Sequence, residues 1–452
     1  MKKLVALLLA FVMVLSLCAC GGKTEDTTET TAASAGTTEA ATEAAASSDE
    51  EVSIVWGDWM LSEDAYVGIY GAMVDNFDAA YDNITVETYT QPYSSYLDQL
   101  LIAAAAGNGP DVAHIKAEWL PQFLALGVVK DLYPYVSEDV LSDFSASSIE
   151  AATIDGQLVG MPWFCNAYAM FYNKALLEKA GVTELPTTMD ELMDAAEKVA
   201  ALGTDENGNK IYGLALANSN LEASEGYNLL PVLWGYGAEY QDADGKIAIA
   251  SDAGIQAFTE IQNLYLNDIS PKGASFKDIR NLFGQGVIGF YWDAEAALSS
   301  CASAAPDADA FYDNTGAMVI PANDGANGYG YLSERYMIVF NSCSEEKMEA
   351  ISQFLDYMSG SEAIQVLQDN NQGKMSSRTS VMETVFSGVD NPITLAFIDA
   401  MDTARSLPSG NLSFMDADEL LSDATTRLAQ GEDVTTVITD IQSQIQALYD
   451  QN

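Results

Sequence analysis

Two cysteines, Cys18 and Cys20, stand one residue apart near the start of the chain. Thiols at this spacing can ligate a soft metal or form a redox pair. A metal site needs a second pair of ligands nearby, and none follows. The single histidine, His114, lies in the apolar stretch DVAHI, where core packing or a hydrogen bond at a sheet edge accounts for it. We therefore expect no metal and no cofactor, and seek another role for the two cysteines.

The charge balance limits the partners of the protein. The chain has 66 acidic residues against 19 basic ones, a formal net charge of -47 at pH 7. A polyanion repels phosphate, and no basic stripe with interleaved aromatic residues appears, so we expect no nucleic acid partner. The charge also favours a soluble monomer. With so many acids, neighbouring carboxylates arise by chance, and no GxSxG, HExxH or GxxxxGK motif marks a catalytic site.

The flanks of the two cysteines indicate export. The start MKK is positive, and Leu4–Leu17 is an almost unbroken apolar run followed by small residues, the pattern of a signal peptide. The run is shorter than the roughly 20 residues that cross a membrane. The ending LCACG resembles the bacterial lipobox, although Cys18 stands where Ala or Ser is usual. The resemblance implies that residues 1–19 are removed and that lipid on Cys20 anchors the protein to the extracytoplasmic face of the cell membrane. Secretion without a lipid anchor is the alternative.

The remaining chain divides by composition. Residues 20–51 are rich in Thr, Ala, Glu and Ser without a large apolar side chain, so they cannot offset the entropy of ordering and form a disordered tether. Val52–Asn452 is about twice the usual size of a single core, which predicts two lobes. Cys165, Cys301 and Cys343 are widely spaced, and we expect buried free thiols there.

Strand and helix patterns alternate from residue 52 onward, as in α/β proteins with parallel pairing. The expected strands are 52–56, 84–89, 111–115, 211–216, 246–250, 287–292, 317–321 and 336–340. Helices are expected at 64–81 and 95–106, and after a capping box formed by Thr188 and Glu191. From residue 345 the chain is almost all helix, and it ends in an amphipathic helix at 434–449.

Several segments occur together in a recognisable order. They are VSIVWGDW, AAAAGNGPDV, GVVKDLYPYV, DGQLVGMPWFCNAYAMFYNKALLEKAGV, LPTTMDELMDAAEKV, FGQGVIGFYW and the stretch from SEEKMEAISQF to GKMSSRTS. This set resembles the extracellular solute-binding proteins of bacterial ABC importers, specifically the carbohydrate-binding group similar to maltose-binding protein. The resemblance covers essentially all of residues 52–452.

The resemblance implies a periplasmic-binding-protein-like fold, in which two α/β lobes are joined by a hinge and the ligand lies in the cleft between them. By analogy, lobe 1 comprises 52–165 plus about 318–355, and lobe 2 about 166–317 plus 356–452. The implied function is capture of a sugar or oligosaccharide and its delivery to the membrane permease of an ABC transporter. Independently, open parallel sheets bind ligands at the carboxyl ends of their strands, and clefts between domains favour small molecules.

Sugars offer hydroxyl groups for paired hydrogen bonds and apolar faces that stack on aromatic rings. We therefore looked for Trp, Tyr, carboxylate, amide and Arg side chains near predicted strand ends and the hinge. Trp56 is expected to fill core, and Asp111 to brace its strand. The predicted ligand-binding residues are Asp58, Trp59, Tyr93, Glu118, Trp119, Trp163, Asn166, Tyr227, Trp234, Trp292, Asp293 and Arg335.

Two other functions fit the same composition. A secreted glycoside hydrolase would need two carboxylates about 5 to 10 Å apart on opposite sides of a sugar. A binding protein for a peptide or a polyamine would share the fold, and a polyamine would suit the acidic surface. The order of the segments favours a sugar receptor that breaks no bond.

Overall fold

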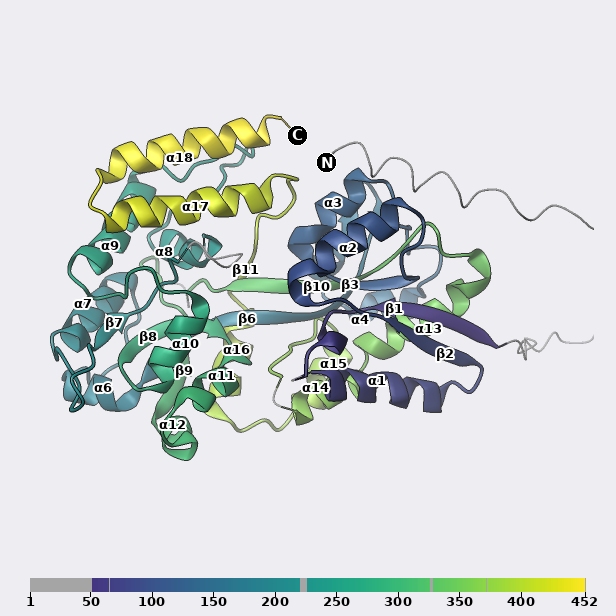
Figure 1. Cartoon of the computed structure of the whole chain (residues 1–452), viewed down its shortest axis with the longest axis horizontal. Helices are drawn as coiled ribbons and strands as arrows, with labels where there is room; N and C mark the ends of the chain where they lie inside the picture. The colour runs from purple at the N-terminus through teal and green to yellow at the C-terminus, as the bar shows by residue number, and fades with distance from the viewer. Residues whose placement is uncertain (1–50, 65, 220–225, 326–327, 371, 452) are drawn as a thin grey trace, which may run out of the picture. The chain divides into compact units, whose positions relative to one another are not determined.

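The structure is a computed structural model that describes residues 51–64, 66–219, 226–325, 328–370 and 372–451. The predicted signal peptide, the lipidation residue Cys20 and nearly all of the tether lie outside these residues. Glu50–Asn452 forms one compact unit. It is built of mixed strands and helices in two α/β lobes, as predicted (Figure 1).

The strands lie between helices along most of the chain. In the described residues they are β1 (Val52–Gly57), β2 (Ile84–Tyr89), β3 (Val112–Lys116), β4 (Thr153–Ile154), β5 (Gln157–Leu158), β6 (Met161–Asn173), β7 (Tyr212–Leu214), β8 (Ile288–Ala294), β9 (Thr315–Met318), β10 (Tyr331–Val339) and β11 (Arg405–Ser406).

The helices range from single turns to 16 residues. The 3-10 helices are η1 (Met60–Ser62), η2 (Ala117–Trp119), η3 (Tyr227–Leu229) and η4 (Glu345–Lys347). The α-helices are α1 (Val67–Ala80), α2 (Tyr93–Ala105), α3 (Leu120–Ala125), α4 (Glu138–Asp143), α5 (Ala146–Ala151), α6 (Lys174–Lys179), α7 (Met189–Ala200), α8 (Leu230–Gly235), α9 (Asp252–Leu266), α10 (Phe276–Gly284), α11 (Ala297–Ala304), α12 (Ala308–Asn314), α13 (Met348–Ser359), α14 (Ser361–Asp369), α15 (Thr379–Val385), α16 (Pro392–Met401), α17 (Phe414–Ala429) and α18 (Val434–Tyr449).

Strand pairing runs through both lobes in the order β2-β1-β3-β10-β6-β8-β7, with β11 beside β10 and β9 beside β6. The expected parallel pairing is correct for β1 with β2 and β3, and for β7 with β8. It is wrong for β6 and β10, which pair antiparallel with each other and with β3 and β8. The reason is that β6 leaves the first lobe and β10 returns to it, so adjacent crossing strands run in opposite directions (Figure 1).

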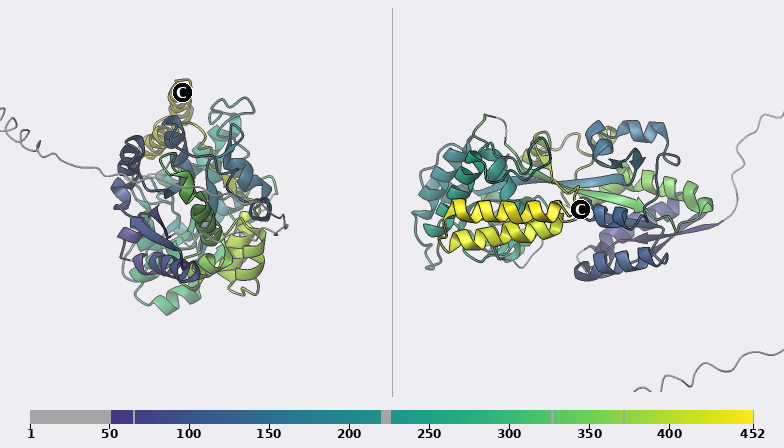
Figure 2. Two further views of the ribbon diagram at one scale, coloured as in Figure 1. Left: turned by 90° about the vertical axis from the view of Figure 1, so that its right-hand side faces the viewer. Right: turned by 90° about the horizontal axis from the view of Figure 1, so that it is seen from above.

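Helices from the end of the chain return to both lobes. Helices α13 and α14 pack against α1, whereas α17 and α18 pack against each other and against α9 (Figure 2). Strand β11 lies between these two groups in the sequence and pairs with the start of β10. The predicted lobe borders stay a prediction, and since α16 packs on β9 and on β6, the contacts favour a return to the second lobe at α16, later than residue 356.

One predicted strand is wrong. Residues 246–250 form no strand, and Ile247 makes only an isolated bridge with Gln241. The backbone amide of Ile247 donates to the side chain of Gln446, and that of Ala250 donates to Gln442. The segment therefore packs against α18, and side-chain oxygens replace the strand partner that the alternating pattern suggested.

Several local expectations are confirmed. Trp56 is fully buried, and Cys165, Cys301 and Cys343 are buried free thiols. The capping box of α7 is present: the Thr188 hydroxyl accepts a hydrogen bond from the amide of Glu191 at 3.2 Å, and the Glu191 carboxylate accepts one from the amide of Thr188. Helix α18 spans the predicted residues.

We expect Thr188→Ala to lower the free energy of unfolding by about 1 kcal/mol, because an alanine leaves an amide of the first turn without its cap. Urea denaturation followed by circular dichroism measures this change. Ser299→Ala is the control, since Ser299 is exposed inside α11 and its hydroxyl bonds only to the carbonyl of Ala296. Equal midpoints for the two variants would show that the capping box contributes nothing.

Candidate ligand-binding site

Aromatic side chains gather where β1 and β3 end. Trp59, in the loop after β1, stacks on His114 with ring centroids 4.0 Å apart and lies 5.3 Å from Trp119. Tyr93, at the start of α2, lies 5.8 Å from Trp59. Trp59 and Trp119 are buried, while Tyr93 is 41% exposed. The cluster therefore opens to solvent at Tyr93.

Asp58 holds the loop that carries Trp59. One carboxylate oxygen of the buried Asp58 lies 2.9 Å from Nδ1 of His114, and the other accepts a hydrogen bond from the amide of Met60 at 2.7 Å. Burial lowers the pKa of His114 and outweighs the attraction of Asp58, which raises it. His114 therefore carries no charge at neutral pH, and the pair fixes the ring on which Trp59 stacks.

Lys116 and Glu118 form the polar border of the aromatic cluster. The ammonium group of Lys116 lies 3.2 Å from the Glu118 carboxylate and faces the rings of Tyr93 and Trp119 at 5.5 and 5.6 Å. Burial alone would raise the pKa of Glu118, but the charges of Lys116 and Arg335 hold it below its ordinary value. Glu118 is therefore ionised, and it neutralises Lys116 inside the protein.

Arg335 lies directly opposite Lys116 in the antiparallel pairing of β10 with β3. It is 9% exposed, and its Nη1 donates hydrogen bonds to the carbonyls of Ser333 and Glu334 and, at 2.7 Å, to the Ser333 hydroxyl. Its Nε is buried without a hydrogen-bond partner in the described structure. The guanidinium is thus held through Nη1, while its Nε–H has no hydrogen-bond acceptor among the described residues.

Lys374 reaches the same strands from the segment after α14. Its ammonium group donates to the Asn166 side-chain oxygen at 3.0 Å and lies 5.4 Å from the centre of the Phe164 ring. Lys374 is 7% exposed. Burial, and after it the charge of Arg335, together lower its pKa to about 7. Asn166 therefore contacts a cation here and is part of the crossing-strand site.

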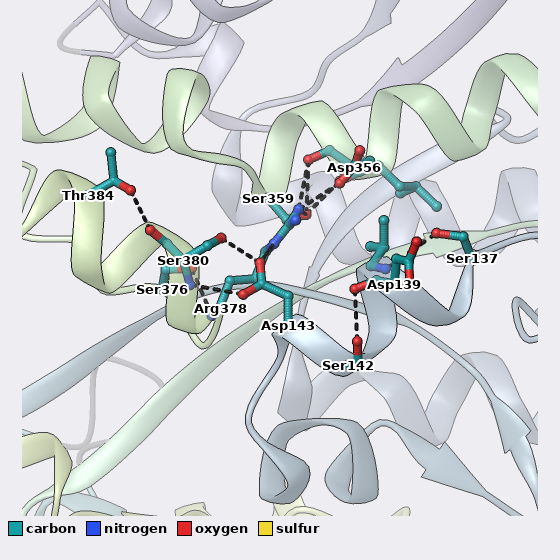
Figure 3. Close-up of polar contacts among 12 residues, drawn as sticks. Ser137, Asp139, Ser142, Asp143, Asp356, Ser359, Ser376, Arg378, Ser380 and Thr384 are labelled. Atoms are coloured by element: carbon teal, nitrogen blue, oxygen red, sulfur yellow. Dashed lines mark hydrogen bonds and ion pairs between the residues drawn. The ribbon is translucent and has the colours of Figure 1, made fainter.

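An arginine outside this site holds the segment that carries Lys374. Arg378 donates from Nε to Asp143 at 2.8 Å and from Nη1 to Asp356 at 2.7 Å (Figure 3). The Asp143 carboxylate also accepts hydrogen bonds from the amide and hydroxyl of Ser380. This network ties α4, α13 and α15 together, and so fixes the chain four residues beyond Lys374.

The second lobe contributes a paired arginine and carboxylate. Arg280 on α10 donates to Asp293 on β8 through two bonds of 2.7 and 3.1 Å, and Asp293 is fully buried. A capping box of Ser275 and Asp278 starts α10 and orients Arg280. Burial raises the pKa of Tyr66 in the first lobe, and the charge of Arg280 counteracts part of that rise. The two lobes therefore face each other within electrostatic range here.

Four predicted site residues lie in the core. The Trp163 ring is fully buried, and its Nε1 donates to the carbonyl of Met358 at 2.7 Å. Trp292 donates to the side chain of Asn228 at 2.6 Å. Tyr227 and Trp234 belong to the hydrophobic cluster under α17 and α18, where the Tyr227 ring stacks on a phenylalanine. Their ligand roles stay a prediction, since each is buried and packed within the protein.

Two pockets flank the crossing strands. One of about 630 Å³ is lined by α3, by Tyr336 and by the loop 406–412. The other, of about 460 Å³, is lined by Trp163, Phe164, Arg335 and the segment 376–379. Both share residues of β10 and β11. Their volumes are in the range of small-molecule sites.

The structure thus brings together most of the predicted set and adds residues that the sequence did not single out. Asp58, Trp59, Tyr93, Glu118 and Trp119 meet at the ends of β1 and β3, and Asn166 and Arg335 meet on the crossing strands. Asp293 lies at the end of β8. The added residues are cations: Lys116, Arg280 and Lys374. The low number of basic residues could have pointed to these three, because the chain has only 19 lysines and arginines against 66 acidic residues.

The chain belongs to the family of bacterial extracellular solute-binding proteins, and the sequence model of this family matches residues 62–365. This membership places the protein outside the cytoplasm, in a family of binding proteins. It confirms the family to which the ordered segments pointed.

Curated relatives and a solved structure agree with this membership. The chain is 27% identical over 283 residues to a putative binding protein of Brucella abortus, covering 62% of this chain and 66% of that protein. It is 27% identical to the galactooligosaccharide-binding protein of Bacillus subtilis, over 65% of this chain and 64% of that one. The chain therefore spans just under two thirds of these relatives' length.

The fold is similar to that of the cyclic α-maltosyl-1,6-maltose binding protein of Arthrobacter globiformis. The two share a TM-score of 0.74 and 22% identity, covering 89% of this chain and 99% of that one. At this identity the likeness establishes the two-lobed fold alone. Among the described helices, none combines the length and apolarity that a membrane crossing requires.

We expect Lys374 to make stability depend on pH. The folded protein holds the pKa of Lys374 at about 7, against an ordinary value of 10.5. Between these values the unfolded chain binds the proton more tightly, so the free energy of unfolding rises with pH. From pH 7 to pH 9, wild type should gain about 2 kcal/mol relative to Lys374→Met.

Urea denaturation of both proteins at several pH values measures this difference. Lys246→Met is the control, because Lys246 lies in an exposed ion pair and its loss should give a flat difference. A flat difference for Lys374→Met as well would mean that the buried ammonium keeps its proton throughout this range.

Proposed function

We propose that the protein is a membrane-anchored extracellular receptor that binds a sugar or oligosaccharide and delivers it unaltered to the permease of an ABC transporter. The ligand lies between the lobes, in contact with the aromatic cluster after β1 and with the polar groups on the crossing strands. Contacts made with both lobes only in the closed state shift the balance between open and closed forms.

The observation that carries this proposal is the aromatic cluster itself. Trp59, Tyr93 and Trp119 lie within 6.0 Å of one another, and the charges of Lys116 and Glu118 border their rings. Aromatic faces beside donors and acceptors suit the apolar faces and hydroxyl groups of a sugar. The relatives named for galactooligosaccharide and for a cyclic maltosyl sugar are in keeping with this ligand class.

The alternatives fit the described residues less well. A glycoside hydrolase needs one free carboxylic acid and one free carboxylate facing a sugar. The buried carboxylates of Asp58, Glu118 and Asp293 have cationic or histidine partners. Glu334 lines both pockets with a pKa that burial raises, so recovery of an unchanged ligand is the observation that separates receptor from hydrolase. A polyamine would meet Arg335 and Lys374, which repel it. We therefore propose binding without catalysis.

The ligand class is tested by a thermal-shift screen of the purified protein against neutral and acidic mono- and oligosaccharides. A ligand at 100 times its dissociation constant should stabilise the protein by about 2.7 kcal/mol. The best hit should be recovered chemically unchanged after long incubation. Conversion to products would favour the hydrolase, and stabilisation by peptides or polyamines alone would contradict a sugar receptor.

We expect Tyr93→Ala to weaken the best hit about tenfold, because one stacking ring is worth about 1 to 1.5 kcal/mol. The variant should remain folded without ligand, with a modest fall in melting temperature, since Tyr93 is 41% exposed and packs on Trp59 and Trp119. Tyr312→Ala is the matched control, because Tyr312 is 44% exposed on α12. Isothermal titration gives both affinities, and equal affinities would remove Tyr93 from the site.

Anchoring rests on Cys20, which lies outside the described residues. We expect Cys20→Ala to move the protein from the membrane fraction of an expressing bacterium to the medium or periplasm, because no acyl chain can then be attached. Cys18→Ala should stay with the membrane, since it restores the usual small residue of the lipobox. Cell fractionation and immunoblotting measure both. Retention of Cys20→Ala in the membrane would favour another mode of attachment.

A further inference from the structure

One face of the crossing strands collects buried positive charge. Lys116 and Arg335 lie opposite each other in the β3–β10 register, and Asn166 lies opposite Ser333 in the β10–β6 register. Alternate residues of a strand share a face, which places Ser333 and Arg335 together. Lys374 joins this face through its bond to Asn166. Three cations therefore meet here, in a protein whose net charge is strongly negative.

The guanidinium of Arg335 presents a free edge. Its Nη1 is held by three acceptors from Ser333 and Glu334, whereas Nε is buried without a partner and Nη2 makes no hydrogen bond within the described structure. The Nε and Nη2 donors lie on the same side of a planar group. That edge matches the two oxygens of a carboxylate, which it binds through two parallel hydrogen bonds.

Lys374 also lacks a counter-charge. Its ammonium group carries three donors and has one neutral acceptor, the amide oxygen of Asn166. Neither Lys374 nor Arg335 makes an ion pair with any described residue. The low pKa of Lys374 has the same cause, because burial and the nearby charge of Arg335 both disfavour its protonated form. The protein thus holds two cations within electrostatic range of each other, neither of which has an ion-pair partner among the described residues.

The other buried or half-buried cations around the site are all paired. Lys116 has Glu118, Arg280 has Asp293, and Arg378 has Asp143 and Asp356. On the cationic face itself, Lys116, Arg335 and Lys374 stand against two carboxylates, Asp58 and Glu118, both already engaged. Glu334 lines the same pocket as Arg335, but burial raises its pKa and so disfavours its charged form. The neutral His114 adds no charge. The face therefore has one positive charge in excess when Lys374 is protonated.

A neutral sugar cannot remove this excess. A hydroxyl group accepts a hydrogen bond from Arg335 or Lys374 but adds no negative charge. With a neutral ligand Lys374 must therefore lose its proton or stay as an unpaired buried ion, which is costly. A single carboxylate fits the free edge of Arg335 and supplies the one negative charge that this face lacks.

We infer that the saccharide bound by this protein carries a carboxylate, as in a uronic acid, and that Arg335 and Lys374 bind it. The inference rests on the proposed function, since it narrows the sugar class of the same site. A sulfate or phosphate ester offers similar oxygens to Arg335. The single charge favours the carboxylate over a phosphate ester, and the planar pair of oxygens favours it over both esters. The ester-bearing sugars enter the test as separate arms.

The test compares matched sugars by isothermal titration with the wild-type protein. The acidic series is galacturonic and glucuronic acid with their di- to tetrasaccharides, and the neutral series is the corresponding galactosides and glucosides. Galactose 6-sulfate and galactose 6-phosphate form the third series. We expect an acidic ligand to bind at least tenfold more tightly than its neutral counterpart and more tightly than either ester.

Two variants locate the contact. Arg335→Gln and Lys374→Met should each weaken the acidic ligand at least tenfold more than they weaken its neutral counterpart. Lys246→Met, which removes an exposed charge on the second lobe, should change neither. Circular dichroism checks that each variant folds. The wild-type comparison needs no variant, so it decides the ligand class even where a variant is unstable.

The failures are distinguishable. Neutral sugars that bind as tightly as acidic ones would overturn the inference and leave the sugar receptor in place. Tighter binding of the sulfate or phosphate ester would overturn the carboxylate and retain the cationic site. Binding of none of the three series would contradict the sugar receptor itself.

Discussion

The antiparallel pairing of β6 with β10 is the constraint on which the rest of the structure depends. β6 is a single strand of 13 residues that pairs with β10 over its first half and with β8 and β9 over its second. Because side chains alternate along a strand, this one pairing fixes which residues of both lobes face the same side. It puts Asn166 opposite Ser333. The pairings that β10 and β6 make on their other sides then bring Arg335 next to Lys116 and align the end of β8 with the far half of β6. A slip of one residue would turn Asn166 and Arg335 away from the cluster.

Electrostatics acts within this frame. The chain is strongly acidic, yet several of the charged groups near the crossing strands are cations, and some of these form ion pairs with buried carboxylates. Glu118 is ionised and neutralises Lys116, and Asp293 does the same for Arg280 through two hydrogen bonds. Such pairs are rigid and neutral, so they shape the site without favouring either sign of charge. The unpaired cations are therefore the groups that give this region its charge preference.

Much of the fold was accessible from sequence, and the site was accessible only in part. The capping box at Thr188 and the span of α18 follow from local rules, because their partners lie within a few residues. Residues 246–250 were mistaken for a strand, since the pattern cannot show that Gln446 and Gln442 supply the partners. The ligand role of Trp163 stays a prediction, and its packing against Trp56 and its bond to Met358 could not be foreseen, because they depend on distant segments. Lys374 was missed because it lies more than 200 residues from Asn166 along the chain.

The division of contacts between the lobes also bears on closure. Arg335 sits on β10, and Lys374 follows α14, whose neighbour α13 packs on β6 and α1. The network of Arg378 fixes the segment beyond Lys374 to α4 and α13. The cationic face thus belongs to the crossing strands and the first lobe, and it can hold one end of a ligand while the lobes are apart. Closure then depends on the ligand contacts that the second lobe adds. In that lobe Arg280, paired with Asp293, lies within electrostatic range of Tyr66 in the first lobe. A ligand drives closure only by the contacts that appear on closing, so the charged end provides retention and the end that reaches the second lobe provides the differential affinity.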